Sequence, residues 1–511
     1  MDIVSFTAAD AGPKKVLSAL TKAGFAIEGQ RPVRRTLLDT FDARLHHAGL
    51  RLEMREGPHT ELILRGGGPV PAQVPVEVAP RLATDLPAGP LRARVGPLLD
   101  VRALMPVLAM GAREATAVRR NNAGKVVAAV RVYTEGTAGP ATSLLPLVAE
   151  VAPFEGFPAA AEEAAKLLRS LGLSRREGDA IDALAGHVGV DLGGFSGSPS
   201  VAMKPSEPAT IAFRRVLANL AETIDANWQG TIDDTDSEFL HDLRVAVRRT
   251  RSVLSHARGV LPSDGREYFR AEFGWLGAVT TPQRDLDVYL IEWPSYVAPL
   301  GAVATELAPV VGHILRRRMA AHVKLVRVLR SARYRAVMTG WRAWIGGAVM
   351  LGASAKRAEA PIGGVVAARL AKAQEQLVGK GRAIDAESPA ESLHELRKDA
   401  KKLRYLLECF GGLLPAGPRK TFVQRLKALQ DNLGEHQDTE VHTAQLRALS
   451  EELHGEPGMT AKVLLAMGRL TEVFDQRRKE ARGVFAERFA AYDTDQTAQA
   501  LAKLLSSAAT S

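Results

Sequence analysis

Two eleven-residue stretches carry nearly the same pattern of basic side chains. Residues 241–251 read HDLRVAVRRTR, and residues 394–404 read HELRKDAKKLR. Each begins with a histidine, which is followed by cations spaced three or four residues apart. Four cations along about 15 Å of helix repel one another unless an anion neutralises them. The pattern therefore predicts a binding site for a polyanion.

A helical wheel at about 100° per residue separates each stretch into two neighbouring stripes. The apolar stripes, which we expect to be buried, are Leu240, Leu243, Val247 and Leu254 in the first copy and Leu393, Leu396, Ala400 and Leu407 in the second. The basic stripes, which contain no acid, are His241, Arg244, Arg248 and Arg251 in the first copy and His394, Arg397, Lys401 and Arg404 in the second. These eight residues are the candidate anion-binding set.

A second set of cations gives weaker support for the same site. Arg249 and Lys402 project away from the basic stripes on the wheel, and the others lie on two further basic helices. This secondary set is Arg249, Lys402, Arg317, Lys324, Arg327, Arg478 and Arg482. The alternative is that the cations pair with acids from neighbouring helices, for which Asp285, Asp287 and Asp438 are candidates. The two histidines lack a metal-like partner four residues on, so we predict no metal site there.

The elements that carry these stripes belong to an internal repeat. A shift of 153 residues aligns the two halves without a gap over more than fifty residues, and places Asp285 on Asp438. Thr235 with Glu238, and Ser388 with Glu391, have capping-box spacing and predict where the two basic helices begin. We expect two helical bundles related by a pseudo-two-fold axis, which brings both basic stripes to one groove.

The rest of the chain predicts an N-terminal domain of a different class. Residues 1–187 contain short β-like runs at 2–6, 35–39, 50–56, 61–66, 125–133 and 144–153, and a helix at 160–172. Residues 188–208 are rich in Gly, Ser and Pro and predict a linker. Residues 209–506 are helical in pattern, with halves at about 209–350 and 362–506 joined through 351–364. Breaks are expected at 261–265, 280–283, 414–418 and 454–458.

Composition agrees with an anionic partner for the helical part. The formal charge is +10 over 511 residues, of which residues 1–200 contribute 23 − 21 = +2 and the remainder 44 − 36 = +8. A single cysteine, Cys409, excludes an internal disulfide and is expected in the core. There is no secretory signal pattern, and the apolar stretch 345–355 is too short to span a bilayer. We therefore expect a cytoplasmic protein without a membrane span.

The duplicated part resembles the CHAD family of helical domains over about 205–505. The residues that carry the resemblance are HDLRVAVRRTRSVL, QRDLDV, HELRKDAKKLRYLLE and LQDNLGEHQD. The resemblance implies two pseudo-symmetric four-helix bundles, a basic central groove and binding of inorganic polyphosphate. By matching position it also implies that the eight residues of the basic stripes face this ligand.

Residues 1–187 are similar to CYTH or triphosphate-tunnel domains, through RRTLLDTFDARLHHAGLRLEMREG with Asp39, Thr40, Gly49 and Leu50 in place. This implies an α+β domain with an antiparallel, tunnel-like barrel. The family's E-x-E-x-K strand is missing from MDIVSF. Around LRLEMR, where the family has two arginines, this chain has Glu53 and Arg55, and its later acidic strand keeps only Glu150. Residues Arg65, Glu77, Arg119 and Arg120 are candidates for remnants of a tunnel. We therefore expect a degenerate domain without catalytic residues, metal ligands or a cofactor.

Three functions remain in competition. The leading hypothesis is non-enzymatic binding of polyphosphate, with recruitment to intracellular polyphosphate granules. The first alternative is a metal-dependent inorganic triphosphatase in residues 1–187, which the missing motif disfavours. The second is nucleic-acid binding, for which no helix-turn-helix, zinc-finger or RNA-binding pattern is present. The basic stripes also lack the aromatic platforms of single-strand binders, apart from Tyr405 near the second.

Overall fold

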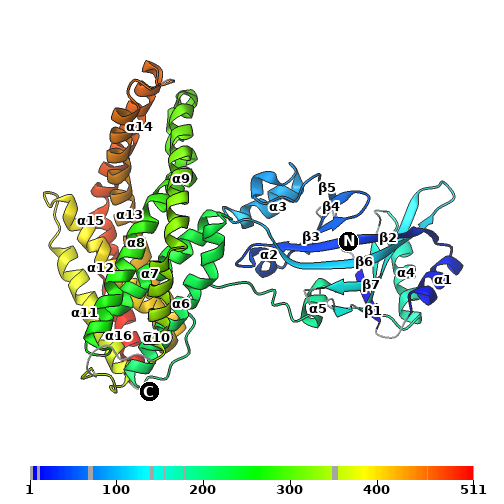
Figure 1. Ribbon diagram of the computed structural model, residues 1–511, viewed down its shortest axis with the longest axis horizontal. Coiled ribbons are helices and arrows are strands. Elements are labelled where there is room, and N and C mark those ends of the chain that lie inside the picture. Colours follow the sequence, from blue (N-terminus) through cyan, green and yellow to red (C-terminus); the bar gives the residue numbers. More distant parts are fainter. Residues whose placement is uncertain are drawn as a thin grey trace. The chain divides into compact units, whose positions relative to one another are not determined.

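The computed structural model divides the chain into two compact units, Met1–Ser196 and Gly197–Ser511 (Figure 1). It describes residues 4–8, 12–66, 73–138, 143–144, 146–152, 154, 156–175, 180–347, 355–456 and 458–509. The predicted domain classes are confirmed, because the first unit is built on an antiparallel sheet and the second is helical. The described part of 188–208 contains no helix or strand, and the first helix of the second unit begins at Ala209.

The first unit contains one antiparallel sheet flanked by short helices. Its strands are β1 Val4–Ala8, β2 Ala26–Asp39, β3 Arg51–Glu56, β4 Thr60–Arg65, β5 Val74–Pro75, β6 Met105–Arg120, β7 Val126–Ala138, β8 Ser143–Leu144, β9 Leu147–Ala152 and β10 Ser174–Arg175. Its helices are α1 Pro13–Lys22, α2 Arg44–His47, η1 Ala83–Asp85, α3 Pro90–Leu99, α4 Pro158–Ser170 and α5 Ala180–His187. The strand order is β10-β1-β9-β7-β6-β2-β3-β4-β5, and β8 pairs with β7.

This sheet curls strongly on itself. Strands β9 and β4 are five places apart in the strand order, which is about 24 Å in a flat sheet at ~4.8 Å per strand. Yet Arg65 of β4 lies 2.9 Å from Glu150 of β9 across the concave face. The curvature places buried charges in the interior, as the predicted tunnel-like barrel requires. The sequence patterns missed α1 and β6, although β6 is one of the longest strands.

The second unit consists of two copies of one helical arrangement. The first copy has α6 Ala209–Ile232, α7 Ser237–His256, α8 Ser263–Val297, η2 Ala298–Leu307, α9 Ala308–Leu329 and α10 Ala332–Ile345. The second has α11 Ile362–Arg382, α12 Ala390–Cys409, η3 Gly411–Leu413, α13 Ala416–Leu453, α14 Ala461–Gly483, α15 Phe485–Tyr492 and α16 Asp495–Ala509. The five helix starts 209, 237, 263, 308 and 332 become 362, 390, 416, 461 and 485 when 153 is added. The repeat thus extends through almost the whole unit.

The two copies share cores and meet at repeat-equivalent residues. One hydrophobic cluster joins helices of both halves, and within it Phe213 and Phe410 have ring centroids 4.8 Å apart. A second cluster joins α8, η2 and α9 to α13 and α14. In it Tyr289 contacts His442, its counterpart 153 residues later, at 5.1 Å between ring centroids. Such a contact is expected where a pseudo-two-fold axis passes. In Figure 1, α9 and α14 project in the same direction from the shorter helices of this unit.

Three local expectations in this unit were wrong. Helix α8 continues through 280–283, because buried side chains on both sides of Pro282 hold it against the core. Helix α7 is capped by Asp236 rather than Thr235, through hydrogen bonds from the Glu238 and Phe239 amides. Helix α12 begins after Pro389, and Ser388 instead pairs with Asp385. Cys409 is buried and free, as predicted.

The helical segment Ser263–Leu329 is long and apolar enough to cross a membrane by length and composition, and 22% of its most apolar window is buried within the described part. Core helices of proteins without membrane spans pass the same test. Leu300, Leu307 and Val310 of this segment are buried against α13 and α14. The segment is therefore weak evidence, and the absence of a membrane span stays a prediction.

Candidate functional site

Helices α7 and α12 lie side by side and present the two basic stripes. The predicted apolar stripes are confirmed, since all eight of their residues are buried. Burial of these stripes fixes how each helix rotates about its axis. The neighbouring basic stripes are thereby held at the boundary between the core and solvent.

Arg244 anchors the first basic stripe to α8. Its side chain is buried, and Nη1 donates to the Gly277 carbonyl at 3.0 Å, to Thr280 Oγ1 at 2.7 Å and to Thr281 Oγ1 at 3.0 Å. Its Nε is buried without a hydrogen-bond partner among the described residues. Burial and the neighbouring Arg248 lower the pKa of Arg244 to about 10, so the guanidinium remains charged at neutral pH. Its hydrogen-bond partners are all uncharged, while the carboxylates of Asp285 and Asp287 partly compensate its positive charge without forming an ion pair with it.

The first stripe lines a cavity of about 600 Å³. The lining residues are Arg244, Arg248 and Arg251 of α7, Gly274, Gly277, Ala278 and Thr281 of α8, and His394 of α12. A Cβ built on Gly277 would lie 3.6 Å from Nη1 of Arg251, so the glycine leaves space beside the guanidinium. Arg248 and Arg251 are exposed and form no ion pair or side-chain hydrogen bond within the described ranges.

The second stripe is partly neutralised by acids of its own half. Arg397 pairs with Asp438 at 3.0 Å, and Arg404 pairs with Glu408 at 2.6 Å and donates to Gln430 at 3.3 Å. The alternative of acid pairing therefore holds for these two cations. Asp287, which we considered for the same role, binds Arg318 instead. The first half has Ser255 where the second has Glu408, so Arg251 lacks the matching acid.

Cations of the two stripes share one electrostatic environment. Burial, Arg397 and Arg248 lower the pKa of Lys401 to about 8. Arg248 is the repeat-equivalent of Lys401, because 401 − 248 = 153. Lys401 forms no ion pair within the part of the chain that the structure describes. The two copies therefore place Arg248 and Lys401 near enough for their charges to interact.

The two histidines occupy different environments. His241 is half-buried near the start of α7. His394 faces the cavity, and its Nδ1 contacts Oε1 of Gln437 on α13. Gln437 was not predicted as a partner from the sequence, although it lies in the LQDNLGEHQD stretch.

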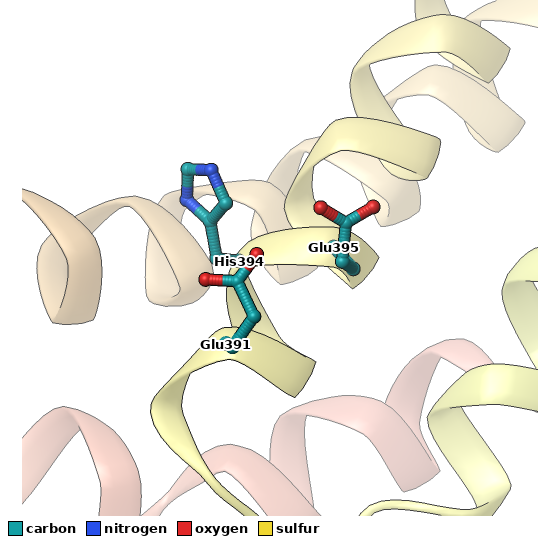
Figure 2. Close-up of side chains that lie close together, drawn as sticks. All are labelled: Glu391, His394 and Glu395. Atoms are coloured by element: carbon teal, nitrogen blue, oxygen red, sulfur yellow. The ribbon is translucent and has the colours of Figure 1, made fainter.

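Figure 2 shows that His394 lies near two carboxylates of the same helix, Glu391 and Glu395. One ligand atom of each residue lies within 4.8 Å of the others, so these side chains are able to approach one metal ion. The predicted absence of a metal site rested only on the position four residues after His394, where Lys398 stands, whereas these carboxylates stand three residues before it and one after it. Glu395, however, pairs with Lys398 at 2.6 Å, which lowers the pKa of that carboxyl group, and Glu391 is exposed. We assign no metal to them.

Most of the secondary cations are held by other partners. Arg249 pairs with Glu408 at 2.7 Å, which ties α7 to α12, and Lys402 pairs with Asp399 at 2.8 Å. Arg317 pairs with Glu452 at 2.9 Å, and Arg478 lies 3.4 Å from Asp475. The Arg482 guanidinium donates to the carbonyls of Asp385, Ala386 and Ser388. Lys324 and Arg327 are exposed.

The interior of the first unit contains a neutralised charge network. Arg35 pairs with Glu53 at 2.6 Å and with Glu150 at 3.2 Å, and Arg65 lies 3.0 Å and 2.9 Å from the same two carboxylates. Nearby, Arg55 pairs with Glu114 at 2.9 Å. Burial alone would raise the pKa of Glu53, but Arg35 and Arg65 overcome it and lower that pKa to about 2.

Sequence reasoning identified only part of this network. Arg35 and Glu114 were missed. On β2 and β6 a charged residue alternates with apolar residues, and this pattern could have indicated that the charge is buried. Arg119 and Arg120 are not remnants of a tunnel, because they pair with Glu163 and Glu28 on the outer side. Glu77 is exposed.

Several solved structures are similar to parts of this chain. The CHAD domain from the plant Ricinus communis is 24% identical, covers 57% of this chain and 95% of its own, and has a TM-score of 0.48. PptA from Streptomyces chartreusis is 18% identical, covers 55% and 99%, and has a TM-score of 0.43. A Hippeastrum putative adenylyl cyclase, described as having a dominant triphosphatase activity, is 12% identical, covers 37% and 96%, and has a TM-score of 0.26.

No curated protein matches the chain in sequence. The family model of the CHAD domain matches residues 215–447. This range contains both basic stripes and the helices that position them. Residues 215–447 of this chain are therefore a CHAD domain.

Proposed function

We propose that this protein binds inorganic polyphosphate in the basic cavity between α7, α8 and α12, without chemical conversion of the ligand. The observation that carries the proposal is the grouping of Arg244, Arg248 and Arg251 around one cavity, where none of them forms an ion pair with a described residue. Lys401 lies close enough to Arg248 for the two charges to interact. Cations that lie close together repel one another, so this arrangement becomes more favourable when an anion enters. Polyphosphate supplies one negative charge per unit along a flexible chain.

The donors suit phosphate oxygens rather than bases. Guanidinium groups offer two parallel N–H donors to an oxyanion, and an ammonium group acts as a point charge. The unpartnered Nε of Arg244 and that of Arg397 are further donors close to the two stripes. The eight lining residues include no Phe, Tyr or Trp, so the cavity has no platform on which a base stacks. Recruitment to polyphosphate granules in the cytoplasm belongs to the same proposal.

The decisive experiment is a binding isotherm of long-chain polyphosphate at two salt concentrations. The test variant is Arg248→Glu/Arg251→Glu, and the control with an equal charge change is Lys372→Glu/Lys503→Glu on α11 and α16. The test variant lacks two cations that are free to contact phosphate. Its affinity should therefore fall by roughly tenfold or more, and the salt dependence of binding should decrease. The control should bind like the wild type.

A comparison between the two halves sharpens this prediction. Arg404→Glu should cost less affinity than Arg251→Glu, because Arg404 is already paired with Glu408. Equal loss in the control and in the test variant would instead mean that only the overall charge matters. Unchanged binding in Arg248→Glu/Arg251→Glu would remove the site from this cavity.

The alternatives are tested in the same preparations. Double-stranded DNA that displaces polyphosphate at equal phosphate concentration would favour the nucleic-acid function. Release of phosphate from tripolyphosphate with Mg²⁺ or Mn²⁺ would favour the triphosphatase. We expect neither, because Glu53 and Glu150 are occupied by Arg35 and Arg65 and are not available to a metal ion.

A further inference from the structure

A second cavity of about 580 Å³ lies between α8, α9 and α13, and shares no lining residue with the basic cavity. Its walls are mainly apolar, formed among others by Val279, Leu286, Ile314, Leu325, Leu446 and Leu449. Cavities of this size with apolar walls and a few polar groups are typical of small-molecule sites. Polyphosphate does not suit such walls.

The internal repeat shows why this space is open. The counterpart of Ala321, which lines the cavity, is Phe474, because 321 + 153 = 474. Phe474 is fully buried in the second half, where its ring packs against Tyr296 at 5.0 Å and His442 at 5.7 Å. The first half has a methyl group in place of this ring. The cavity is therefore a property of the first half and not a general consequence of the fold.

One buried polar atom in the cavity lacks a partner. Tyr289 is 4% exposed and lines the cavity, and its hydroxyl forms no hydrogen bond with any described residue. A buried hydroxyl without a hydrogen-bond partner is unfavourable, so a ligand that accepts its hydrogen bond removes this penalty. Burial raises the pKa of Tyr289, which keeps the hydroxyl protonated and able to donate.

The charged groups at the cavity indicate which ligand charge it favours. Lys324 is exposed and has no ion-pair partner among the described residues, and Arg317 is held by Glu452 at 2.9 Å. Asp285 also lines the cavity and opposes a ligand of high negative charge. Because Arg317 is already paired with Glu452, Lys324 is the cation that remains for a ligand, and one positive charge suits a ligand with a single anionic group.

We propose that this cavity binds a small amphiphile with an apolar body and one anionic group, such as a medium-chain carboxylate. The apolar walls take up the body, while the Tyr289 hydroxyl and the Lys324 ammonium group bind the anionic end. This site is separate from the polyphosphate site, and the proposal does not depend on the proposed polyphosphate binding.

The test uses the full-length protein and sodium decanoate as the probe, with binding measured by isothermal titration calorimetry. The main variant is Ala321→Phe, which introduces the ring that the second half already accommodates at Phe474. The control is Leu315→Phe, at an exposed position of α9 that does not line the cavity. Lys324→Met tests the charge, and decanol replaces decanoate in a parallel titration.

We expect saturable binding by the wild type and by Leu315→Phe, with a loss of roughly tenfold or more in Ala321→Phe because the ring fills the space. Lys324→Met should reduce the preference for decanoate over decanol. Polyphosphate binding by Ala321→Phe should remain, which shows that the variant is folded. Absent binding by the wild type, retained binding by Ala321→Phe, equal binding of decanol, or displacement of decanoate by polyphosphate would each overturn the proposal.

Discussion

At the scale of single residues, Lys401 is the cation whose charge is easiest to change. Its pKa of about 8 in the folded protein lies below the ordinary lysine value of about 10.4, so the free protein has lost about half of this charge at pH 8 and most of it by about pH 9. A bound polyanion favours the charged form and raises this pKa again. Binding must then take up a proton in the window between these two values.

We therefore predict that polyphosphate affinity falls as pH rises from 8 towards 10, by at most about tenfold per pH unit for one linked proton. Lys401→Met should bind more weakly at pH 7 and lose most of the slope in this window. Isotherms at several pH values in buffers of equal ionic strength measure both effects. The same slope in Lys401→Met, or a flat profile in the wild type, would contradict the prediction.

The residue patterns predicted which cations lie on one face of a helix, but not which of them are paired. The apolar stripes determine helix rotation, so the positions of Arg248, Arg251 and Lys401 follow from spacing alone. Pairing depends on side chains from other elements, such as Asp438 and Gln430 on α13. Those contacts depend on helix packing, which spacing along one helix does not specify. The cavity beside Ala321 could not be predicted for the same reason, because it also depends on how the helices pack.

At the scale of elements, the strands of the first unit depend on mutual neutralisation of buried charges. Arg35 of β2 and Arg65 of β4 share Glu53 of β3 and Glu150 of β9. Removal of one partner from a buried ion pair leaves the others uncompensated, at a cost of about 3–5 kcal/mol. The network therefore holds together strands that do not pair directly.

We predict that Glu53→Gln lowers the unfolding free energy of the first unit by about 3–5 kcal/mol. Glu77→Gln, at an exposed position, should change it by about 0.5 kcal/mol or less. Urea denaturation followed by circular dichroism of the sheet measures both. Because the pKa of Glu53 is lowered to about 2, its contribution is present above about pH 4.5 and is lost as pH falls towards 2. Equal stability of the two variants would show that the network is not stabilising.

Local signals located most elements but failed where tertiary packing overrides them. Pro282 predicted a break, yet α8 continues because its buried residues on either side remain in the core. The pattern at 105–120 was missed because β6 mixes Ala, Gly and charges with few β-branched residues. Both cap positions shifted by one residue, from Thr235 to Asp236 and from Ser388 to Pro389.

At the scale of the whole molecule, the repeat length of 153 was the most informative feature of the sequence. It reflects a duplicated unit, so one number predicted the starts of the second set of helices from the first. The divergence between the copies accompanies the two sites for which we propose ligands. Ser255 stands where the second half has Glu408, so Arg251 has no matching acid. Ala321 stands where the second half has Phe474, so the first half contains an apolar cavity.

The division into two units leads to the last prediction. All eight residues of the basic stripes, and the Gly197 carbonyl that accepts from Arg249, belong to residues 197–511. We therefore expect a fragment of residues 197–511 to bind polyphosphate within about twofold of the full chain, because the electrostatic contacts are all retained. The same fragment with Arg248→Glu/Arg251→Glu should lose this binding. A helical, folded fragment that does not bind would mean that residues 1–196 contribute directly to the site, and would shift attention to the charges on the surface of the sheet.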